Sequence, residues 1–173
     1  MLTLESLNAD KPLYVFLAIE FAEKVITIWE REYPEDMRPR KAIEAAKEWL
    51  KNPSTAAAND AYVAYAAAYT AGYTAAAARD AANDAAANAA AYAAASAASA
   101  AYTAHYAAAA THAAKALETD EETLIHEVIL ESLDWILQYK VDNGQSFGDP
   151  ELILDYLTEE QKQSFLFNLD SVA

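Results

Sequence analysis

The sequence predicts an all-α fold, a compact antiparallel helical bundle, and three observations predict it. Residues 61–92 read AYVAYAAAYTAGYTAAAARDAANDAAANAAAY, with tyrosines at 62, 65, 69 and 73. This spacing keeps the four rings on one face of an α-helix, whereas it would scatter them over both faces of a strand. Alanine has the highest helix propensity. The flanking segments carry apolar residues at helical spacing, bounded by prolines and by an Asn-Gly pair.

Prolines bound the first two predicted helices. Asp10 can cap a helix with Pro12 in its first turn, and apolar residues follow at helical spacing until Pro34 ends the pattern. A second helix begins near Pro39 and ends at Pro53. Because the link between them is short, we expect these two helices to form a hairpin.

The alanine-rich segment, residues 54–117, is too long to be one rod of a compact domain. A continuous helix of this length would extend about 95 Å at 1.5 Å per residue. It must therefore fold back at least once, which predicts an alanine- and tyrosine-rich helical hairpin at the centre of the bundle. The polar run RDAAND at 79–84 is the predicted turn, because Asn and Asp compete for backbone hydrogen bonds. Gly72 is the alternative hinge.

Three more helices are predicted in the C-terminal part of the chain from capping signals. The first begins at Thr119 or Asp120, where Thr119 and Glu122 match a capping box, and ends at Asn143-Gly144. The second runs from Asp149-Pro150 through Tyr156, and the third opens with Thr158 and Gln161 and carries Phe165, Leu166 and Leu169.

A chain of 173 residues with this pattern predicts a single domain over 1–173, with a helical core at 12–117 and acidic helices at 118–173. The net charge is -15, and it is concentrated at one end. Residues 118–173 carry 14 acidic and 2 basic side chains. A field of this sign repels phosphate backbones, so we expect no direct nucleic-acid binding, and it attracts basic partners.

Composition excludes several classes of site. Cysteine is absent, so disulfides and thiolate metal ligands are excluded. The N-terminal residues carry Glu5 and Asp10 in place of the lysines of a secretory signal, and polar residues interrupt every alanine run long enough to span a bilayer. We therefore expect a cytoplasmic protein that does not enter membranes. Nucleophile motifs, phosphate-binding glycine loops and HExxH helices are also missing, so we predict no enzyme activity and no cofactor.

The N-terminal half of the chain resembles a known family. The segment AIEFAEKVITIWEREYPEDMRPRKAIEAAKEWL, followed by alanine-rich helices ending in TAHYAAAATHAAKAL, is similar to the Imm-5-like family of bacterial and phage immunity proteins. The resemblance covers about residues 12–117, and its most specific stretch is YPEDMRPRKAIEAAKEWL. It implies binding to a partner protein rather than chemistry, and it supplies no catalytic residues.

The candidate partner-binding residues are carboxylates of the C-terminal third. Glu127, Glu131 and Asp134 share one helical face, and further carboxylates continue the stripe beyond that helix. We predict a docking surface made of Glu127, Glu131, Asp134, Glu151, Asp155 and Glu159. A solvated face that only confers solubility is the alternative.

Arg38 and Arg40 lie at the predicted start of the second helix, where the helix macrodipole disfavours cations. We expect structural ion pairs with Asp36, Glu35 or the first-helix residues Glu30 and Glu32. The alternative is an anion site formed by Arg38, Arg40 and Asp36.

The histidines do not have the spacing that is typical of a metal-binding site. His105 and His112 are seven residues apart, so they cannot chelate one ion as an i, i+4 pair would. A site would need His126 and Asp80 or Asp84 as well, and we expect hydrogen-bonded structural histidines and no metal.

These observations leave three hypotheses for function. The first is an immunity or phage counter-defence inhibitor that docks its acidic surface on a basic protein, such as a toxin or a defence nuclease or effector. The second is a DNA mimic that blocks a nucleic-acid-binding enzyme with ordered carboxylates. The third is an enzyme or metal protein using His105, His112 and His126. Exposed alanine faces could also pair two copies into a homodimer.

Overall fold

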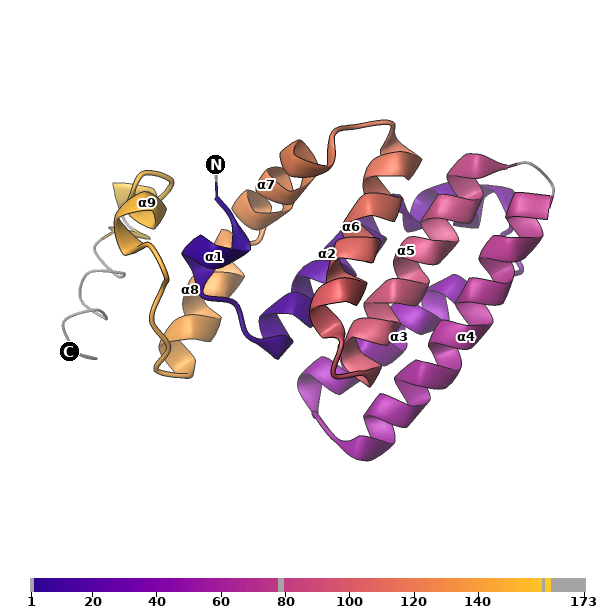
Figure 1. Ribbon diagram of the computed structural model, residues 1–173, viewed down its shortest axis with the longest axis horizontal. Coiled ribbons are helices and arrows are strands. Elements are labelled where there is room, and N and C mark those ends of the chain that lie inside the picture. Colours follow the sequence, from indigo (N-terminus) through magenta and orange to yellow (C-terminus); the bar gives the residue numbers. More distant parts are fainter. Residues whose placement is uncertain (1, 78–79, 160, 163–173) are drawn as a thin grey trace. The chain divides into compact units, whose positions relative to one another are not determined.

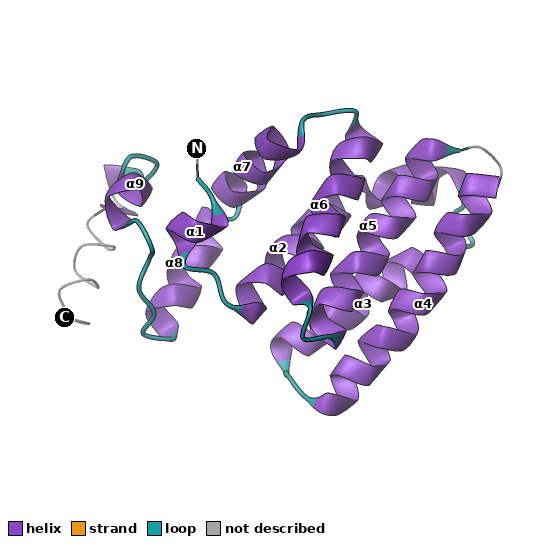
Figure 2. Ribbon diagram, viewed as in Figure 1, coloured by secondary structure: helices purple, strands orange, loops and turns teal. Residues whose placement is uncertain are grey.

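The computed structural model describes residues 2–77, 80–159 and 161–162, and every regular element in these residues is a helix (Figure 2). The predicted all-α fold is confirmed. The chain forms two compact units, one of residues 11–124 and one of residues 1–10 with 125–173. The prediction that 1–173 forms one domain stays a prediction, and each unit is described by itself.

The unit of residues 11–124 is a five-helix bundle in its described part. Its helices are α2 (Lys11–Glu32), α3 (Arg38–Lys51), α4 (Thr55–Ala77), α5 (Ala81–Ala98) and α6 (Tyr102–Leu117). In Figure 1, α4, α5 and α6 lie side by side in one layer, and α2 and α3 form a second layer behind them. Helix α5 packs against all four of the others.

Helix α5 is buried on nearly every side because its side chains are short. Its buried residues are alanines, one serine and two asparagines: Asn83, Ala85, Ala86, Ala87, Asn88, Ala89, Ala90, Ala91, Ala93, Ala94, Ala95, Ser96 and Ala97. A helix that is apolar all round can only be stable inside a bundle. Alanine surfaces let neighbouring backbones approach at the short end of the usual helix spacing of about 8–10 Å.

One cluster shows how this packing works. Ala42 of α3, Ala68 of α4 and Ala91 and Ala94 of α5 are all fully buried against one another. The partly buried side chains of Ala64, Tyr65 and Tyr69 cover the cluster from α4. Three helices therefore meet through methyl groups, and the larger tyrosines close the edge of the contact.

The larger core side chains come from α2 and α3. Phe21, Trp29 and Ile43 are buried almost completely. Trp29 Nε1 donates a hydrogen bond to the carbonyl of Asp36 at 2.9 Å, which holds the turn between α2 and α3. Lys11 Nζ donates to the carbonyl of Ala97 at 3.0 Å, in the last turn of α5, where the helix dipole favours a cation.

The proline-bounded helices agree with α2 and α3, and the alanine-rich segment forms three helices. The predicted hairpin is present as α4 and α5, and α6 follows after a second turn at residues 99–101. Helix α4 ends at Ala77 and α5 begins at Ala81, so residues 81–84 of the predicted turn already belong to α5, and its residue 79 lies outside the described residues. Gly72 as the hinge is wrong, because it lies inside α4.

Asp80 explains where α5 begins. Its Oδ1 accepts a hydrogen bond from the backbone amide of Asn83 at 3.2 Å, and its Oδ2 accepts one from Asn83 Nδ2 at 2.7 Å. An N-cap carboxylate of this kind satisfies an amide that has no partner within the helix. The polarity of 79–84 thus marks a helix start.

Helix α7 (Glu121–Glu131) contains the boundary between the two units. The backbone amide of Thr123 donates to Asp120 Oδ2 at 2.9 Å, so Asp120 caps this helix in place of the predicted Thr119 and Glu122 box. The predicted helix to Asn143 is interrupted at Ser132, after which α8 (Leu133–Asp142) continues. Gly144, with φ of 60°, follows α8 as the predicted Asn-Gly stop.

The unit that holds the C-terminal residues also contains α1 (Leu4–Leu7) and α9 (Pro150–Leu154), which contact each other. Asp149 caps α9 as predicted, because its Oδ1 accepts from the Leu152 amide at 3.0 Å. The helix ends at Leu154 rather than Tyr156. A Cβ on Gly148 would lie 2.1 Å from the Glu5 carbonyl oxygen, so only glycine fits there.

The capping box of Thr158 and Gln161 is confirmed by two reciprocal hydrogen bonds. The Thr158 amide donates to Gln161 Oε1 at 2.7 Å, and the Gln161 amide donates to Thr158 Oγ1 at 3.3 Å. The predicted apolar residues of that last helix, Phe165, Leu166 and Leu169, lie outside the described residues.

A double-mutant cycle tests the contact between α4 and α5. A Cβ on Gly72 would lie 3.0 Å from Asn88 Oδ1 and 3.1 Å from Asn88 Nδ2. Glycine in a helix interior is less stable than alanine by about 1 kcal/mol. We expect Gly72→Ala to gain this stability only in an Asn88→Ala background, where the contact is gone, with a coupling of at least about 0.5 kcal/mol in urea unfolding. Equal effects of Gly72→Ala in both backgrounds would show that the two helices are further apart.

Candidate functional site

The predicted docking carboxylates are all exposed. We call the six residues Glu127, Glu131, Asp134, Glu151, Asp155 and Glu159 the acidic surface. The first two lie on α7, Asp134 is in the first turn of α8, and Glu151 is in the first turn of α9. Glu127 and Glu131 share one face of α7 because they are four residues apart. All six belong to the unit that holds the C-terminal residues.

Two of these carboxylates have partners within the chain. Gln161 Nε2 donates a short hydrogen bond to Asp134 Oδ1, which ties the capping box at 158–161 to the start of α8. Glu159 Oε1 forms an ion pair with Lys162 Nζ at 2.8 Å, although the Glu159 side chain remains largely exposed. The structure therefore brings Asp134 near the segment that carries Glu159.

Lys140 adds little positive charge to the surface of this unit because it is buried. Its side chain is only 1% exposed, and its Nζ donates to the carbonyl of Asn8 at 2.6 Å and lies 5.9 Å from the Phe147 ring centre. Burial lowers the pKa of Lys140, and the nearby Asp10 carboxylate opposes that shift. The other described lysine of this unit, Lys162, pairs with Glu159. The two lysines therefore cancel little of the negative electrostatic field of the exposed carboxylates.

Asp10 supports the buried part of this unit. Its Oδ2 accepts hydrogen bonds from the Tyr139 hydroxyl and from Gln145 Nε2, both at 2.7 Å. Burial and the Asp10 carboxylate raise the pKa of Tyr139 to about 12. The phenol is therefore protonated at neutral pH and donates to Asp10, which positions Asp10 beside Lys140.

The arginines at the start of α3 form ion pairs. Arg38 holds Asp36 with two nitrogens, Nε at 2.9 Å from Oδ1 and Nη2 at 2.5 Å from Oδ2. Arg40 reaches back to α2, where its Nε donates to Glu30 at 2.7 Å and its Nη1 donates to Glu23 at 2.8 Å. The anion site proposed for Arg38, Arg40 and Asp36 stays a prediction.

Glu23 is a partner that the sequence did not indicate. It lies two turns before Glu30 on α2, and it also accepts from Lys47 Nζ at 2.6 Å. Burial acts to raise the pKa of Glu23, but the hydrogen bonds from Lys47 and Arg40 outweigh it and lower the pKa. The hydrogen bonds from Arg38 likewise lower the pKa of Asp36. The expected partners Glu32 and Glu35 are exposed.

The histidines do not converge. His105 and His112 both stack on Tyr92, with ring centres at 6.0 and 5.4 Å. His126 lies in the other unit, where its Nδ1 accepts from the Leu2 amide at 3.1 Å. In the part of the chain that the structure describes, no group of three or more His, Asp or Glu side chains is arranged to hold a metal ion.

The row of tyrosines on α4 continues onto α5, as expected for Tyr92. Neighbouring rings of Tyr62, Tyr65, Tyr69 and Tyr73 lie 6.0, 5.8 and 5.2 Å apart, which confirms that they share a face of α4. Tyr92 of α5 contacts Tyr65 and Tyr69 and continues the row to α6 through the two histidines. Tyr62 and Tyr73 are exposed by 61% and 64%. A pocket at the Tyr73 end of this row has walls from both α4 and α5, so the sequence of one helix alone could not predict it.

The fold defines an all-α bundle protein, and its C-terminal helices carry exposed carboxylates. The chain belongs to the family described as "Imm-5 like putative immunity protein", whose model matches residues 8–140. The match extends beyond the expected 12–117 through α7 and into α8. It includes Glu127, Glu131 and Asp134, whereas Glu151, Asp155 and Glu159 lie after it. The chain matches no curated protein and no solved structure.

Among the described helices there is none whose length and hydrophobicity would suffice to cross a lipid bilayer.

Removing Arg40 tests the ion-pair network at the start of α3. Arg40→Ala leaves Glu30 without this partner and Glu23 with Lys47 alone, so we expect the free energy of unfolding to fall by about 1–2 kcal/mol. Arg40→Lys should recover only part of it, because an ammonium cannot reach two carboxylates with a planar fork. Lys41→Ala, at an exposed neighbouring position, should change stability by less than about 0.5 kcal/mol in the same urea titration. Equal losses for Arg40→Ala and Lys41→Ala would contradict a structural role for the network.

Proposed function

We propose that this chain is a non-enzymatic binding protein that neutralises a basic partner protein by docking its acidic surface on it. The partner would be a toxin or a defence nuclease or effector acting in the cytoplasm. Membership of an immunity-protein family supports this proposal, because the role of an immunity protein is to bind a partner protein and not to catalyse a reaction. The homodimer expected from exposed alanine faces stays a prediction.

The observation that carries the proposal is the charge of the C-terminal helices. Six carboxylates are exposed on and beside α7, α8 and α9, while the Lys140 side chain of the same unit is buried. A surface of one sign steers an oppositely charged partner and raises the association rate, and this effect weakens as salt rises. We favour this function over a DNA mimic, because Asp134 and Glu159 are bound to Gln161 and Lys162 and do not extend a free row of charges.

Neutralising the acidic surface should weaken binding. The variant replaces Glu127, Glu131 and Glu151 by Gln and Asp134 and Asp155 by Asn. We expect affinity for a purified toxin or defence effector that the wild type neutralises to fall at least about tenfold at low salt, chiefly through slower association. Its salt dependence should also become weaker than that of the wild type. Association and dissociation rates measured by surface plasmon resonance at two salt concentrations check both expectations.

A matched control carries the same change in charge on the other unit. It replaces Glu32, Glu35, Glu44 and Glu48 by Gln and Asp60 by Asn, all of which are exposed residues of α2 to α4 or their turns. The control should bind like the wild type. Wild-type affinity in the acidic-surface variant would refute the docking surface and leave the family role intact. Failure of the wild type to bind any basic toxin or defence effector, or to protect cells from one, would refute the neutralising function.

A further inference from the structure

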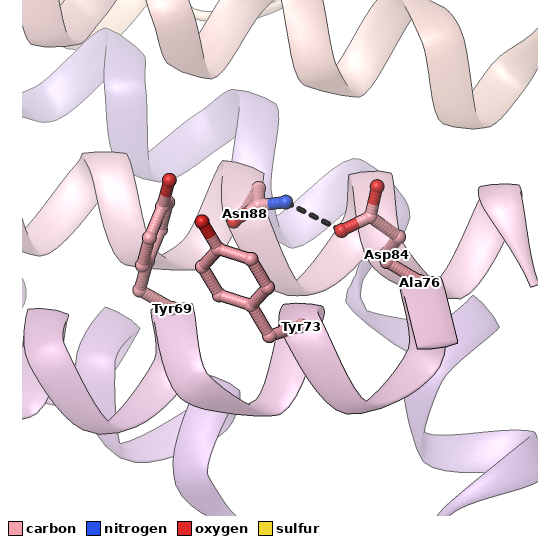
Figure 3. Close-up of a pocket in the computed structure, with 5 residues that line it drawn as sticks. All are labelled: Tyr69, Tyr73, Ala76, Asp84 and Asn88. Carbon is pink, nitrogen blue, oxygen red and sulfur yellow. Dashed lines mark hydrogen bonds between the residues drawn. The ribbon is translucent and has the colours of Figure 1, made fainter. Parts of the chain in front are cut away.

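A small pocket lies between α4 and α5, on the unit of residues 11–124. It has a volume of about 220 Å³ and is lined by Tyr69, Tyr73 and Ala76 of α4 and by Asp84 and Asn88 of α5 (Figure 3). None of these residues belongs to the acidic surface. The size suits one small polar group, because pockets for drug-sized ligands are larger, from about 300 Å³ upward.

Two aromatic rings form one wall of the pocket. The rings of Tyr69 and Tyr73 have centres 5.2 Å apart and are nearly perpendicular, at 83°. Figure 3 shows both side chains rising from α4 toward α5, with the Tyr73 hydroxyl on the side of Asn88 and with Asp84 further along α5. Tyr73 is 64% exposed, so a group can approach this wall from solvent. The faces of phenol rings carry negative electrostatic potential and attract cations.

Asn88 contributes a buried acceptor without a donor. The residue is 7% exposed, and its Nδ2 donates to Asp84 Oδ1 at 2.8 Å. Its Oδ1 has no hydrogen-bond partner among the described residues. Buried amide oxygens are nearly always hydrogen-bonded, so this atom, which lies on the side of Gly72, lacks a donor. Because Nδ2 is engaged by Asp84, the amide offers the pocket an acceptor and not a donor.

Asp84 contributes the charge. Its side chain is 20% exposed, and its Oδ2 lies 3.9 Å from Lys115 Nζ, at the outer limit of an ion pair, while the Lys115 side chain is 54% exposed. The lysine is therefore only loosely paired with this carboxylate. A carboxylate, an unpaired amide oxygen and two ring faces all favour a positively charged group that carries N–H donors, and they disfavour an anion.

We propose that this pocket binds an alkylammonium or guanidinium group, with the cation on the rings of Tyr69 and Tyr73 and its N–H donors on Asp84 and Asn88 Oδ1. The group belongs either to a small free amine or to a lysine or arginine side chain of a protein. This site does not depend on the acidic surface, so each can fail without the other.

The test is a titration of the isotopically labelled full chain followed by nuclear magnetic resonance. Methylguanidinium and n-butylammonium should produce saturable shifts in the ring signals of Tyr69 and Tyr73 and in the side-chain amide of Asn88. The neutral analogue N-methylurea and the anion butyrate should not. We expect Asp84→Asn to weaken methylguanidinium binding about tenfold, because charge-assisted hydrogen bonds are the stronger ones. Tyr73→Leu should weaken it about threefold or more through the lost cation–π contact.

Controls separate a specific site from general charge effects. Asp60→Asn removes an exposed carboxylate of α4 outside this pocket and should leave methylguanidinium affinity unchanged. Thermal unfolding of each variant shows whether it is folded, and Tyr73→Leu, at an exposed position, tests the site even where Asp84→Asn destabilises α5. The peptide acetyl-Gly-Arg-Gly-amide distinguishes the two sources. Tighter binding than methylguanidinium indicates a protein side chain, and weaker binding indicates a free cation.

Three results would overturn the proposal. The first is the absence of saturable shifts with all three cationic probes. The second is equal binding of N-methylurea, which would show that charge is not recognised. The third is wild-type affinity in folded Asp84→Asn and Tyr73→Leu variants, which would place the cation elsewhere.

Discussion

The close approach of α5 to four surrounding helices is the constraint on which the bundle of residues 11–124 depends. Its buried positions are alanine, serine and asparagine, so no large side chain keeps the neighbouring backbones apart. The apolar bulk of the core has to come from α2 and α3, and these helices carry Phe21, Trp29 and Ile43. Packing through methyl groups is dense, and a change of even one methylene is felt in such a contact.

The alanine contacts around α5 exclude large and charged side chains, and the candidate sites are formed by the side chains that lie outside these contacts. Tyrosines that cannot enter the alanine contacts line its edge, where they form a row from Tyr62 to Tyr92 and on to His105 and His112. The pocket at Tyr73 exists because Gly72 leaves room for the Asn88 amide beside α4. Charge is kept off α5 altogether apart from Asp84 in its first turn. Exposed acidic side chains lie instead on α7, α8 and α9, where we propose that a basic partner docks.

Much of this fold could be predicted from the sequence, because local chemistry marks the ends of helices. Pro34, Pro39 and Pro53 bound α2 and α3, and the tyrosine spacing identifies α4 as a helix. The turn at 99–101 carries only serine and alanine, whose local preferences do not oppose a helix strongly, so no residue type indicated it. The contacts between helices could not be predicted from the sequence for another reason. Glu23 pairs with Arg40, and Asn88 faces Gly72, because of the register in which the helices pack against each other. The spacing of residues within one segment does not specify this register.

The most direct test of the alanine contact is the stability of a chain in which one of these methyl groups is enlarged. Ala91 is fully buried between α3 and α4, whereas Ala66 of α4 is exposed. Ala91→Leu should lower the free energy of unfolding by about 1–3 kcal/mol, because overpacking forces the helices apart. Ala66→Leu should change it by less than about 0.5 kcal/mol. Equal stability of the two variants in urea unfolding would contradict the account, since it would mean that α5 is not closely packed against its neighbours.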